Sequence, residues 1–308
     1  MKLQLLSIFL LVIVMPTAWG KKPRPKIPDQ KKTESIYFED NRRLVLNEGT
    51  DEEYQLSKSV AAQISLSKLS LKTPEEYTFL YDNLKNGLNF CSDEKFVEMP
   101  MLSDCSGFLV ADNILMTAGH CVDEAYKCKE KVWVFDYLNQ TSSYKNEQEI
   151  IFKKDQIYTC KEVITKVIKG EKGAKIDYAL VLLDHKVTDR RPFSIKRLNW
   201  PKVSNDLVMI GHPLGLPKII TDQFYLMKGE GDINAVINAD SFSGNSGSPI
   251  IEKGTKNVVG MLIGGELDLR YDYFAGCNRP YKCSESNCGG EYMLNYRYFP
   301  VKEIPFRL

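Results

Sequence analysis

The sequence predicts an all-β protein, a barrel or sandwich of short strands. From Gly107 onward the apolar runs are short and rich in Val, Ile, Tyr and Phe, and Gly, Asn, Asp and Pro separate them. Such runs are typical of strands joined by tight turns. We expect a first strand at Val60–Leu66, followed by Gly107–Ala111, Ile114–Thr117, Val132–Phe135, Glu162–Ile168, Tyr178–Leu183, Leu207–Ile210, Ile219–Leu226, Ala235–Ile237, Pro249–Ile251, Val258–Ile263 and Tyr292–Tyr298.

Three segments precede these strands. Residues 1–20 combine Lys2, an apolar run and small residues before a cut after Gly20, which is typical of a secretory signal. The apolar run is too short for a membrane anchor, so we expect a secreted or periplasmic protein without an anchor after signal cleavage. Residues 21–32 are basic and proline-rich and are expected to be disordered. Residues 21–55 form either a propeptide or an N-terminal arm packed on the barrel.

A helix is expected at Thr73–Asn86. Thr73 is a good N-cap, Pro74 occupies the first helical position, and Glu76 lies three residues after the cap. Leu80 and Leu84 would form its apolar face. We expect its role to be structural.

Composition excludes some functions and indicates a compartment. The formal net charge is +1, with 41 basic and 40 acidic residues, so we expect no nucleic-acid partner. Motifs for nucleotide, haem or EF-hand binding are lacking, so we expect no cofactor and no metal. Eight cysteines in a chain with a signal segment predict disulfides.

The stretch from Asp240 to Pro249 (DSFSGNSGSP) carries the candidate chemistry. Ser246 stands near Gly244 and Gly247, which allow a tight turn before a strand. The N–H groups of Gly244 and Ser246 are placed to bind one oxygen, which is how a tetrahedral acyl intermediate is stabilised. A serine needs a base and an orienting acid to become a nucleophile.

The base and the acid are sought among few residues. His120 ends an apolar run, LMTAGHC, and Asp177 directly precedes another, YALVLL. The order His120, Asp177, Ser246, with separations of 57 (177 − 120) and 69 (246 − 177) residues, defines a candidate triad. We expect His212, among turn-forming residues, to stabilise a loop, and His185, in a charged loop, to be solvated.

These three motifs resemble those of the chymotrypsin-like serine proteases, and the Asn before the serine with Ser-Pro after its glycine is similar to the bacterial V8-like branch. The resemblance implies two antiparallel six-stranded β-barrels over residues 56–308, with a boundary near 190–205 and a catalytic cleft between them. It implies that protein or peptide substrates are cleaved through an acyl-enzyme. We expect a monomer. Two alternatives remain: a catalytically silent relative that binds protein in the cleft, and an esterase using the same triad.

The resemblance also implies a disulfide between Cys105 and Cys121, which closes the loop carrying His120. The other six cysteines allow 15 connectivities. Cys128 with Cys160 is one candidate bridge, which would leave Cys91 to pair with Cys277, Cys283 or Cys288. A metal site at those last three is a weaker alternative, because their spacing matches no common zinc pattern.

Specificity and maturation are less determined. Asp240 lies six residues before Ser246, where trypsin-like enzymes hold the acidic base of the primary pocket, which suggests a Lys or Arg preference. V8-like enzymes read a glutamate with a histidine where Leu262 stands here, so the resemblance does not support a Glu preference. Asn245 replaces the aspartate that pairs with a new N-terminus in trypsin-like zymogens, so we expect no such ion pair. The expected substrate-binding residues are Asp240, Ser241, Leu262, Ile263, Gly264 and Gly265.

Overall fold

A computed structural model of the chain describes residues 36–37, 39–122, 128–139, 149–171, 173–195, 206–229, 232–265, 267–283 and 289–304. The predicted signal segment and residues 21–35 lie outside these ranges. Residues 32–308 form one compact unit, to which all described residues belong. Within the described residues, every helix is too short or too polar to cross a membrane.

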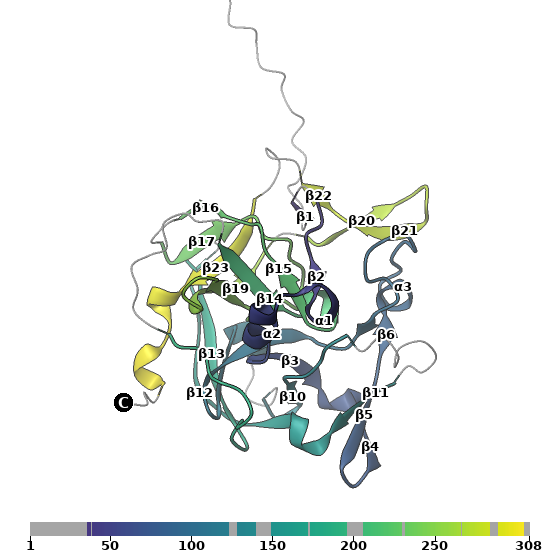
Figure 1. Cartoon of the computed structure of the whole chain (residues 1–308). Helices are drawn as coiled ribbons and strands as arrows, with labels where there is room; N and C mark the ends of the chain where they lie inside the picture. The colour runs from purple at the N-terminus through teal and green to yellow at the C-terminus, as the bar shows by residue number, and fades with distance from the viewer. Residues whose placement is uncertain are drawn as a thin grey trace, which may run out of the picture. The chain divides into compact units, whose positions relative to one another are not determined.

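The first half of this unit is a closed barrel of six strands in the order β10-β12-β13-β9-β8-β3, all antiparallel (Figure 1). Its interior holds large apolar side chains, among them Trp133 and Leu115, both fully buried. The strands are β3 (Val60–Ser65), β8 (Cys105–Ala111), β9 (Ile114–Thr117), β10 (Lys131–Val134), β12 (Ile157–Lys169) and β13 (Ile176–Leu183).

The second half is built on an eight-stranded antiparallel sheet in the order β16-β17-β23-β19-β18-β14-β15-β2. The prediction of an all-β fold in two bodies is confirmed, and the second body gains a strand from the N-terminal segment. The strands are β2 (Arg43–Leu44), β14 (Leu207–Gly211), β15 (Ile219–Thr221), β16 (Leu226–Lys228), β17 (Asn234–Ile237), β18 (Pro249–Glu252), β19 (Asn257–Gly264) and β23 (Glu291–Asn295).

The N-terminal segment packs on this domain as an arm, defined here as residues 36–37 and 39–57. Its strand β1 (Ile36–Tyr37) pairs with β22 (Lys282–Cys283), and β2 pairs with β15. Two helices follow, α1 (Val45–Glu48) and α2 (Asp51–Ser57), and α2 begins with a capping box between Thr50 and Glu53. The side chains of Ile36 and Val45 are buried. The described part of the leader therefore pairs with strands β22 and β15.

The expected helix at Thr73–Asn86 is wrong. The structure has a hairpin of β4 (Leu69–Thr73) and β5 (Glu76–Leu80), to which β11 (Glu149–Lys153) adds a third strand. Thr-Pro-Glu-Glu suits a β-turn as well as a helix start, because Pro fixes φ for both. The alternation of side chains along this segment favours the strand over the helix. Tyr77 and Phe79 point to one face, where Phe79 is fully buried.

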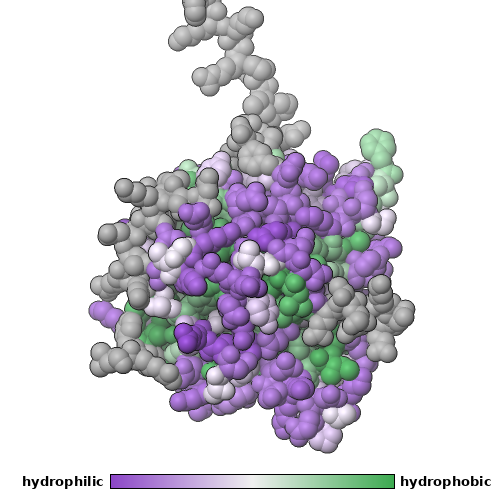
Figure 2. All heavy atoms as spheres, in the orientation of Figure 1, coloured by the Kyte–Doolittle hydropathy of each residue, from purple (hydrophilic) through white to green (hydrophobic). Residues whose placement is uncertain are grey.

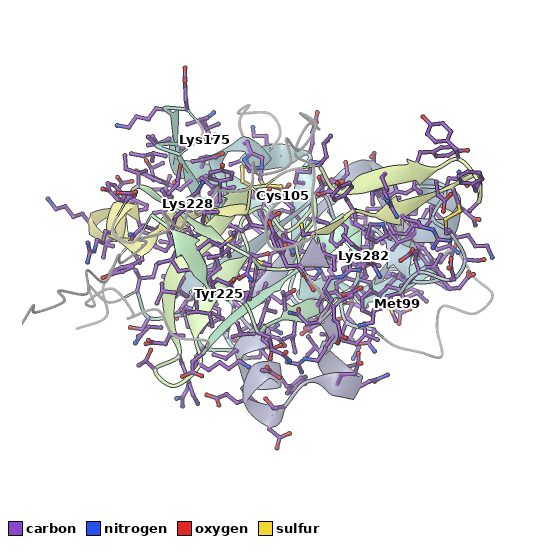
Figure 3. All side chains as sticks on the ribbon, turned by 90° about the horizontal axis from the view of Figure 1, so that it is seen from above. Met99, Cys105, Lys175, Tyr225, Lys228 and Lys282 are labelled. Atoms are coloured by element: carbon purple, nitrogen blue, oxygen red, sulfur yellow. A yellow bond between two sulfur atoms is a disulfide. The ribbon has the colours of Figure 1, made fainter. Side chains whose placement is uncertain are left out.

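The remaining elements are short. A hairpin of β20 (Leu269–Asp272) and β21 (Cys277–Pro280) extends from the second body, and Figure 3 shows it reaching outward beyond Lys282. In Figure 2 a hydrophobic protrusion stands where Figure 1 draws this hairpin. The other elements are β6 (Asp82–Asn83), α3 (Leu84–Gly87), β7 (Pro100–Met101) and the 3₁₀ turns η1 (Leu66–Lys68), η2 (Gly119–Val122), η3 (Lys154–Gln156), η4 (Pro213–Gly215), η5 (Tyr296–Tyr298) and η6 (Val301–Glu303).

Disulfides join segments far apart in the sequence. The described bridges are Cys91–Cys277, Cys105–Cys121 and Cys128–Cys160. The second is the pair that the resemblance implied. Because Cys277 is bonded to Cys91, its sulfur is not available to a metal, and Cys288 lies outside the described residues.

Candidate active site

Strand register brings His120 and Asp177 together. Asp177 is the second residue of β13, and His120 lies in η2, three residues after β9 ends. The two strands are antiparallel, with Ala179 opposite Thr117. The start of β13 and the exit from β9 therefore lie at the same end of the barrel.

Asp177 holds His120 by both carboxylate oxygens. Its Oδ1 accepts a hydrogen bond from the His120 backbone N–H at 3.0 Å, and its Oδ2 lies 2.8 Å from His120 Nδ1. Asp177 is fully buried, while the His120 side chain is 35 % exposed. Burial raises the pKa of Asp177, but the His120 hydrogen bond and the charges of His120 and Lys175 outweigh it and hold that pKa below its ordinary value. The carboxylate is therefore ionised at neutral pH.

Lys175 is a second partner of this carboxylate and is a cation. Its Nζ lies 2.5 Å from Asp177 Oδ2, the oxygen that also binds the imidazole. Its backbone N–H donates to Asn234 Oδ1 at 2.7 Å, and its carbonyl accepts from Asn234 Nδ2 at 2.8 Å. Asn234 is buried on β17, in the second body. Lys175 thus links Asp177 to the opposite body.

Ser246 lies in a tight turn directly before β18. Gly244 and Gly247 on either side have φ of +96° and +88°, the left-handed region that glycine adopts without strain. Ser106 on β8 holds the turn from the first barrel, since its N–H donates to Ser246 O at 2.9 Å and its Oγ donates to Gly244 O at 2.8 Å. The same Oγ accepts the His212 N–H at 2.9 Å.

The turn leaves two backbone donors unpaired. The N–H groups of Asn245, Gly247 and Ser248 donate to backbone carbonyls. Within the described part of the chain, the N–H groups of Gly244 and Ser246 donate to no other group. Buried backbone donors are normally paired, so two open ones beside a partly exposed serine provide a place for an oxygen of a ligand.

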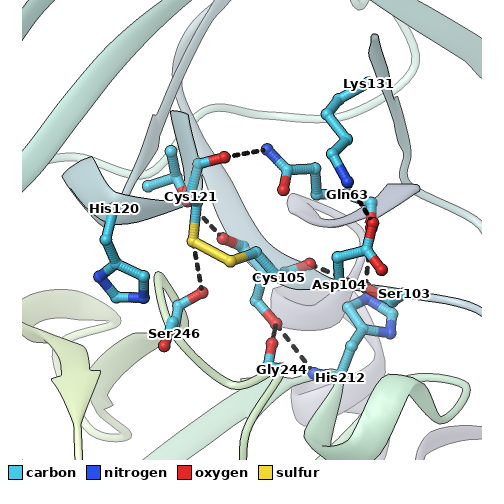
Figure 4. Close-up of a disulfide and its surroundings, with 12 residues drawn as sticks. Gln63, Ser103, Asp104, Cys105, His120, Cys121, Lys131, His212, Gly244 and Ser246 are labelled. Atoms are coloured by element: carbon cyan, nitrogen blue, oxygen red, sulfur yellow. Dashed lines mark hydrogen bonds and ion pairs between the residues drawn. A yellow bond between two sulfur atoms is a disulfide. The ribbon is translucent and has the colours of Figure 1, made fainter. Parts of the chain in front are cut away.

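His120 and Ser246 lie next to each other beside the Cys105–Cys121 disulfide (Figure 4). Cys121, the residue after His120, places its Sγ 3.8 Å from Ser246 O. This is a van der Waals contact, because a disulfide sulfur carries no proton. The disulfide thus packs the loop that bears His120 against the turn that bears Ser246.

Asn245 is satisfied within its own turn. It is buried, its Nδ2 donates to Ser241 Oγ at 3.1 Å, and its Oδ1 accepts from Ser248 Oγ at 3.3 Å. An uncharged amide bonded to two serines of the same loop requires no external cation.

Asp240 does not face a substrate pocket, which corrects the sequence expectation. It is fully buried, and its two oxygens accept the backbone N–H groups of Tyr37 at 2.6 Å and Asn41 at 2.9 Å. Burial raises its pKa to about 7, even though these two donors lower it. Its carboxylate therefore anchors the arm.

Two more expected substrate residues are buried. Leu262 is 2 % exposed and packs in the core of the second body, and Ser241 is 1 % exposed. Neither side chain is available to a substrate. The backbone of the next three residues, in contrast, is available on one side. β18 pairs with β19 only as far as Met261, so within the described residues no strand lies beside that edge of Ile263, Gly264 and Gly265. The Ile263 side chain is itself buried.

The other two histidines have structural surroundings. His212 is fully buried and stacks on Tyr137, its Nδ1 lies 3.0 Å from Leu216 O, and burial lowers its pKa to about 3. It is neutral and braces a loop. His185 is exposed, beside Asp184.

The disulfide also bears on metal binding. Among the described residues, the one cluster of possible metal ligands is Cys105, His120 and Cys121. Its two sulfurs are bonded to each other, so no thiolate is present to bind a metal.

Sequence reasoning missed Ser106, Lys175 and Asn234. Ser106 follows a cysteine in a strand, and nothing in the sequence marks its hydroxyl as the contact to the glycine turn. Lys175 stands two residues before Asp177, and this alternate spacing at a strand start was a usable signal, because residues i and i+2 share a face. Asn234 had no signal, since its contact to Lys175 spans 59 residues.

A comparison with protein families identifies one match. Residues 105–261, just over half of the chain, match the family model of the trypsin-like peptidase domain. A search of curated proteins finds no match. Among solved structures, the active form of the Rv3671c protease from M. tuberculosis is 15% identical, with 92% of this chain and 95% of that chain covered and a TM-score of 0.43. A Glu endopeptidase in complex with MPD is 16% identical, with 87% and 97% covered and a TM-score of 0.46. The VesB protease of Vibrio cholerae is 11% identical, with 85% and 65% covered and a TM-score of 0.47.

Proposed function

The chain belongs to the trypsin-like peptidase family, and from this premise we propose that it is an exported serine endopeptidase with Ser246, His120 and Asp177 as its triad. Ser246 attacks the carbonyl carbon of the scissile bond while His120 removes its proton. His120 then returns that proton to the leaving amine. In the second half of the reaction water attacks the acyl carbon, His120 takes the water's proton, and it returns that proton to the Ser246 oxygen as the acyl group leaves. Asp177 fixes the imidazole tautomer and stabilises its cation.

The bond between Asp177 and His120 Nδ1 is the observation that carries this proposal. It orients the ring and makes Nδ1 the protonated nitrogen, so that Nε2 is the atom able to accept a proton. Within the described residues Nε2 has no partner, and Ser246 is the neighbouring hydroxyl in Figure 4.

The unpaired N–H groups of Gly244 and Ser246 support an oxyanion hole. In enzymes that stabilise an oxyanion in this way, removing one such hydrogen-bond donor lowers kcat by about 10²–10³-fold. Gly244 is required on geometric grounds, because a Cβ there would lie 2.5 Å from His212 O at a positive φ.

The substrate strand is proposed to be Ile263–Gly265, whose open edge accepts an extended peptide by backbone pairing. We propose that the residue before the cut is selected without the carboxylate of Asp240, which anchors the arm. A fluorogenic peptide library varied at that residue tests this, with Asp240→Asn expected to keep the preference of the unaltered chain. A changed preference in Asp240→Asn contradicts the proposal.

A fluorophosphonate probe tests the triad itself. The purified chain is expected to be labelled and to cleave peptides, and both properties are expected to be lost in Ser246→Ala and in His120→Ala. Ser243→Ala, on the same turn, is the matched control and should retain labelling. Absence of labelling in the unaltered chain would instead favour the silent, protein-binding alternative, and cleavage of esters without peptides would favour the esterase.

A further inference from the structure

The β20–β21 hairpin exposes aromatic side chains at its tip. Tyr273 is 87 % exposed, Phe274 is fully exposed and Tyr271 is 46 % exposed. The rings of Tyr271 and Tyr273 meet edge to face, with centroids 5.1 Å apart. We call these three residues the aromatic tip. The hydrophobic protrusion of Figure 2 stands where Figure 1 draws this hairpin, and exposed apolar groups gathered in one place mark an interaction site.

The aromatic tip is held in place by covalent and ionic contacts. The Cys91–Cys277 bridge ties β21 to the segment that follows α3, 186 residues earlier in the chain. Arg279 on β21 binds Glu94 at 2.7 Å, Asp93 at 2.9 Å and Asp272 at 3.0 Å. Asp272 Oδ1 also accepts the N–H of Phe274 at 3.0 Å. A prearranged aromatic surface loses little conformational entropy when it binds.

The root of the hairpin contacts the turn that carries the nucleophile. Asp268, directly before β20, accepts the Ser243 N–H at 2.8 Å, and Ser243 lies three residues before Ser246. β20 has four residues, which at 3.3 Å each place the aromatic tip about 13 Å from the root. An extended peptide covers that distance with about four residues.

The direction of the substrate strand determines which side of a substrate reaches the tip. Leu262 exchanges backbone hydrogen bonds with Gly247 and Ser248, so this end of the strand lies at the nucleophile. The chain then continues through Gly265 to the hairpin, which begins at Leu269. A peptide that pairs antiparallel with this strand runs the opposite way, so its amino-terminal side extends toward the hairpin.

We propose that the aromatic tip is an exosite that binds apolar side chains of an extended protein substrate, about four residues beyond those paired with Ile263–Gly265 on the amino-terminal side of the cut. This inference rests on the proposed peptidase function. A second copy of the chain fits less well, because three aromatic side chains bury at most about 750 Å², below the roughly 800 Å² per partner of a stable interface. An anionic membrane fits less well, because three acids surround Arg279.

Fluorogenic peptides that share one cleavage sequence test this proposal. One ends three residues before the cut. Two are longer by five residues on the amino-terminal side, one with Leu and Phe and one with Gly and Ser. A fourth carries Leu and Phe on the carboxyl side. We expect kcat/KM for the apolar amino-side peptide to exceed that of the short peptide by about tenfold, and the other two extensions to have no effect.

The variants remove the aromatic tip without touching the triad. The double variant Tyr273→Ser, Phe274→Ser should lose the tenfold gain and cleave the short peptide within twofold of the unaltered chain. Leu71→Ser is the matched control, since Leu71 is 64 % exposed on β4, and it should retain the gain. An equal gain in the double variant, or a gain on the carboxyl side, overturns the proposal. The proposal is also overturned if the double variant changes in sedimentation or in vesicle binding while it keeps the tenfold gain in kcat/KM.

The short peptide separates this inference from the proposed function. If the unaltered chain cleaves it and the long peptides show no gain, the exosite fails and the peptidase stands. If the short peptide is not cleaved and Ser246 is not labelled, the proposed function fails, and the exosite with it.

Discussion

Replacing Asp240 by asparagine should change how stability depends on pH. Asp240 is fully buried, and burial raises its pKa from 3.8 to about 7, against the lowering effect of the Tyr37 and Asn41 N–H groups. The folded protein therefore holds this proton more tightly than the unfolded chain does. Asp240 contributes stability that is complete below pH 3.8 and is lost as the pH rises toward 7.

The size of the effect follows from the two pKa values. Between pH 3.8 and 7 the folded state binds one proton that the unfolded state has released. Stability then falls by about 1.4 kcal/mol per pH unit, or about 4 kcal/mol in total. This is a large share of the roughly 5–15 kcal/mol that stabilises a typical domain. Above pH 7 the contribution no longer changes.

Urea unfolding, followed by the fluorescence of buried Trp133, measures this. The free energy of unfolding of the unaltered chain, minus that of Asp240→Asn, should fall by about 4 kcal/mol between pH 4 and pH 8. Subtracting the two cancels every other titrating group. A difference constant within about 1 kcal/mol over this range refutes the reasoning, because Asp240 would then titrate alike in both states.

Glu53→Gln is the matched control of opposite sign. Its Arg43 and Thr50 partners lower the pKa of Glu53 from 4.5 to about 2, outweighing its burial. Its contribution is present above pH 4.5 and is lost as the pH falls toward 2. Between pH 5 and pH 8 the free-energy difference for Glu53→Gln should therefore stay constant while that for Asp240→Asn changes.

Three further changes have definite expected outcomes. Lys175→Met removes the lysine partner of Asp177 and should lower kcat roughly tenfold with KM unchanged; steady-state kinetics measure this, and Lys175→Arg should retain most activity. Ser106→Ala leaves the buried Gly244 O and His212 N–H without a partner and should cost about 1–3 kcal/mol in urea unfolding; an unchanged midpoint contradicts the bridging role. Gly244→Ala places a Cβ against His212 O and should slow fluorophosphonate labelling at least about a hundredfold, whereas labelling at the original rate would show that the turn tolerates a side chain.

The sequence predicted those parts of the fold that depend on local pattern. Short alternating apolar runs became strands near the expected bounds, and Ile114–Thr117 coincides with β9. The helix expected at Thr73 failed because the same cap and proline signals fit a turn. What selects the strand β5 is its pairing with β11, about 70 residues later, and the burial of Phe79.

In the candidate site, too, the sequence predicted what depends on local pattern and missed what depends on tertiary packing. The residues of the candidate triad were found from their local contexts, since each stands at the end or the start of an apolar run. The role of Asp240 was not found, because its position relative to Ser246 carries no information about residues 37 and 41, about 200 positions earlier. The pairing partner of a buried carboxylate is set by tertiary packing, which a motif does not encode.

The arm and Lys175 show how this chain holds its two halves in register. The proposed triad is divided between two bodies, and it works only if their relative position is fixed to within about an ångström. Asp240 anchors the arm in the second body, and Lys175 joins Asp177 of the first body to Asn234 of the second. Ser106 spans the same boundary at the nucleophile turn. Because Asn245 in that turn is uncharged and bonded to Ser241 and Ser248, we expect this alignment not to depend on a newly cut N-terminal amine. Activity should therefore survive the addition of residues before position 36, and it should fall when the arm itself is deleted.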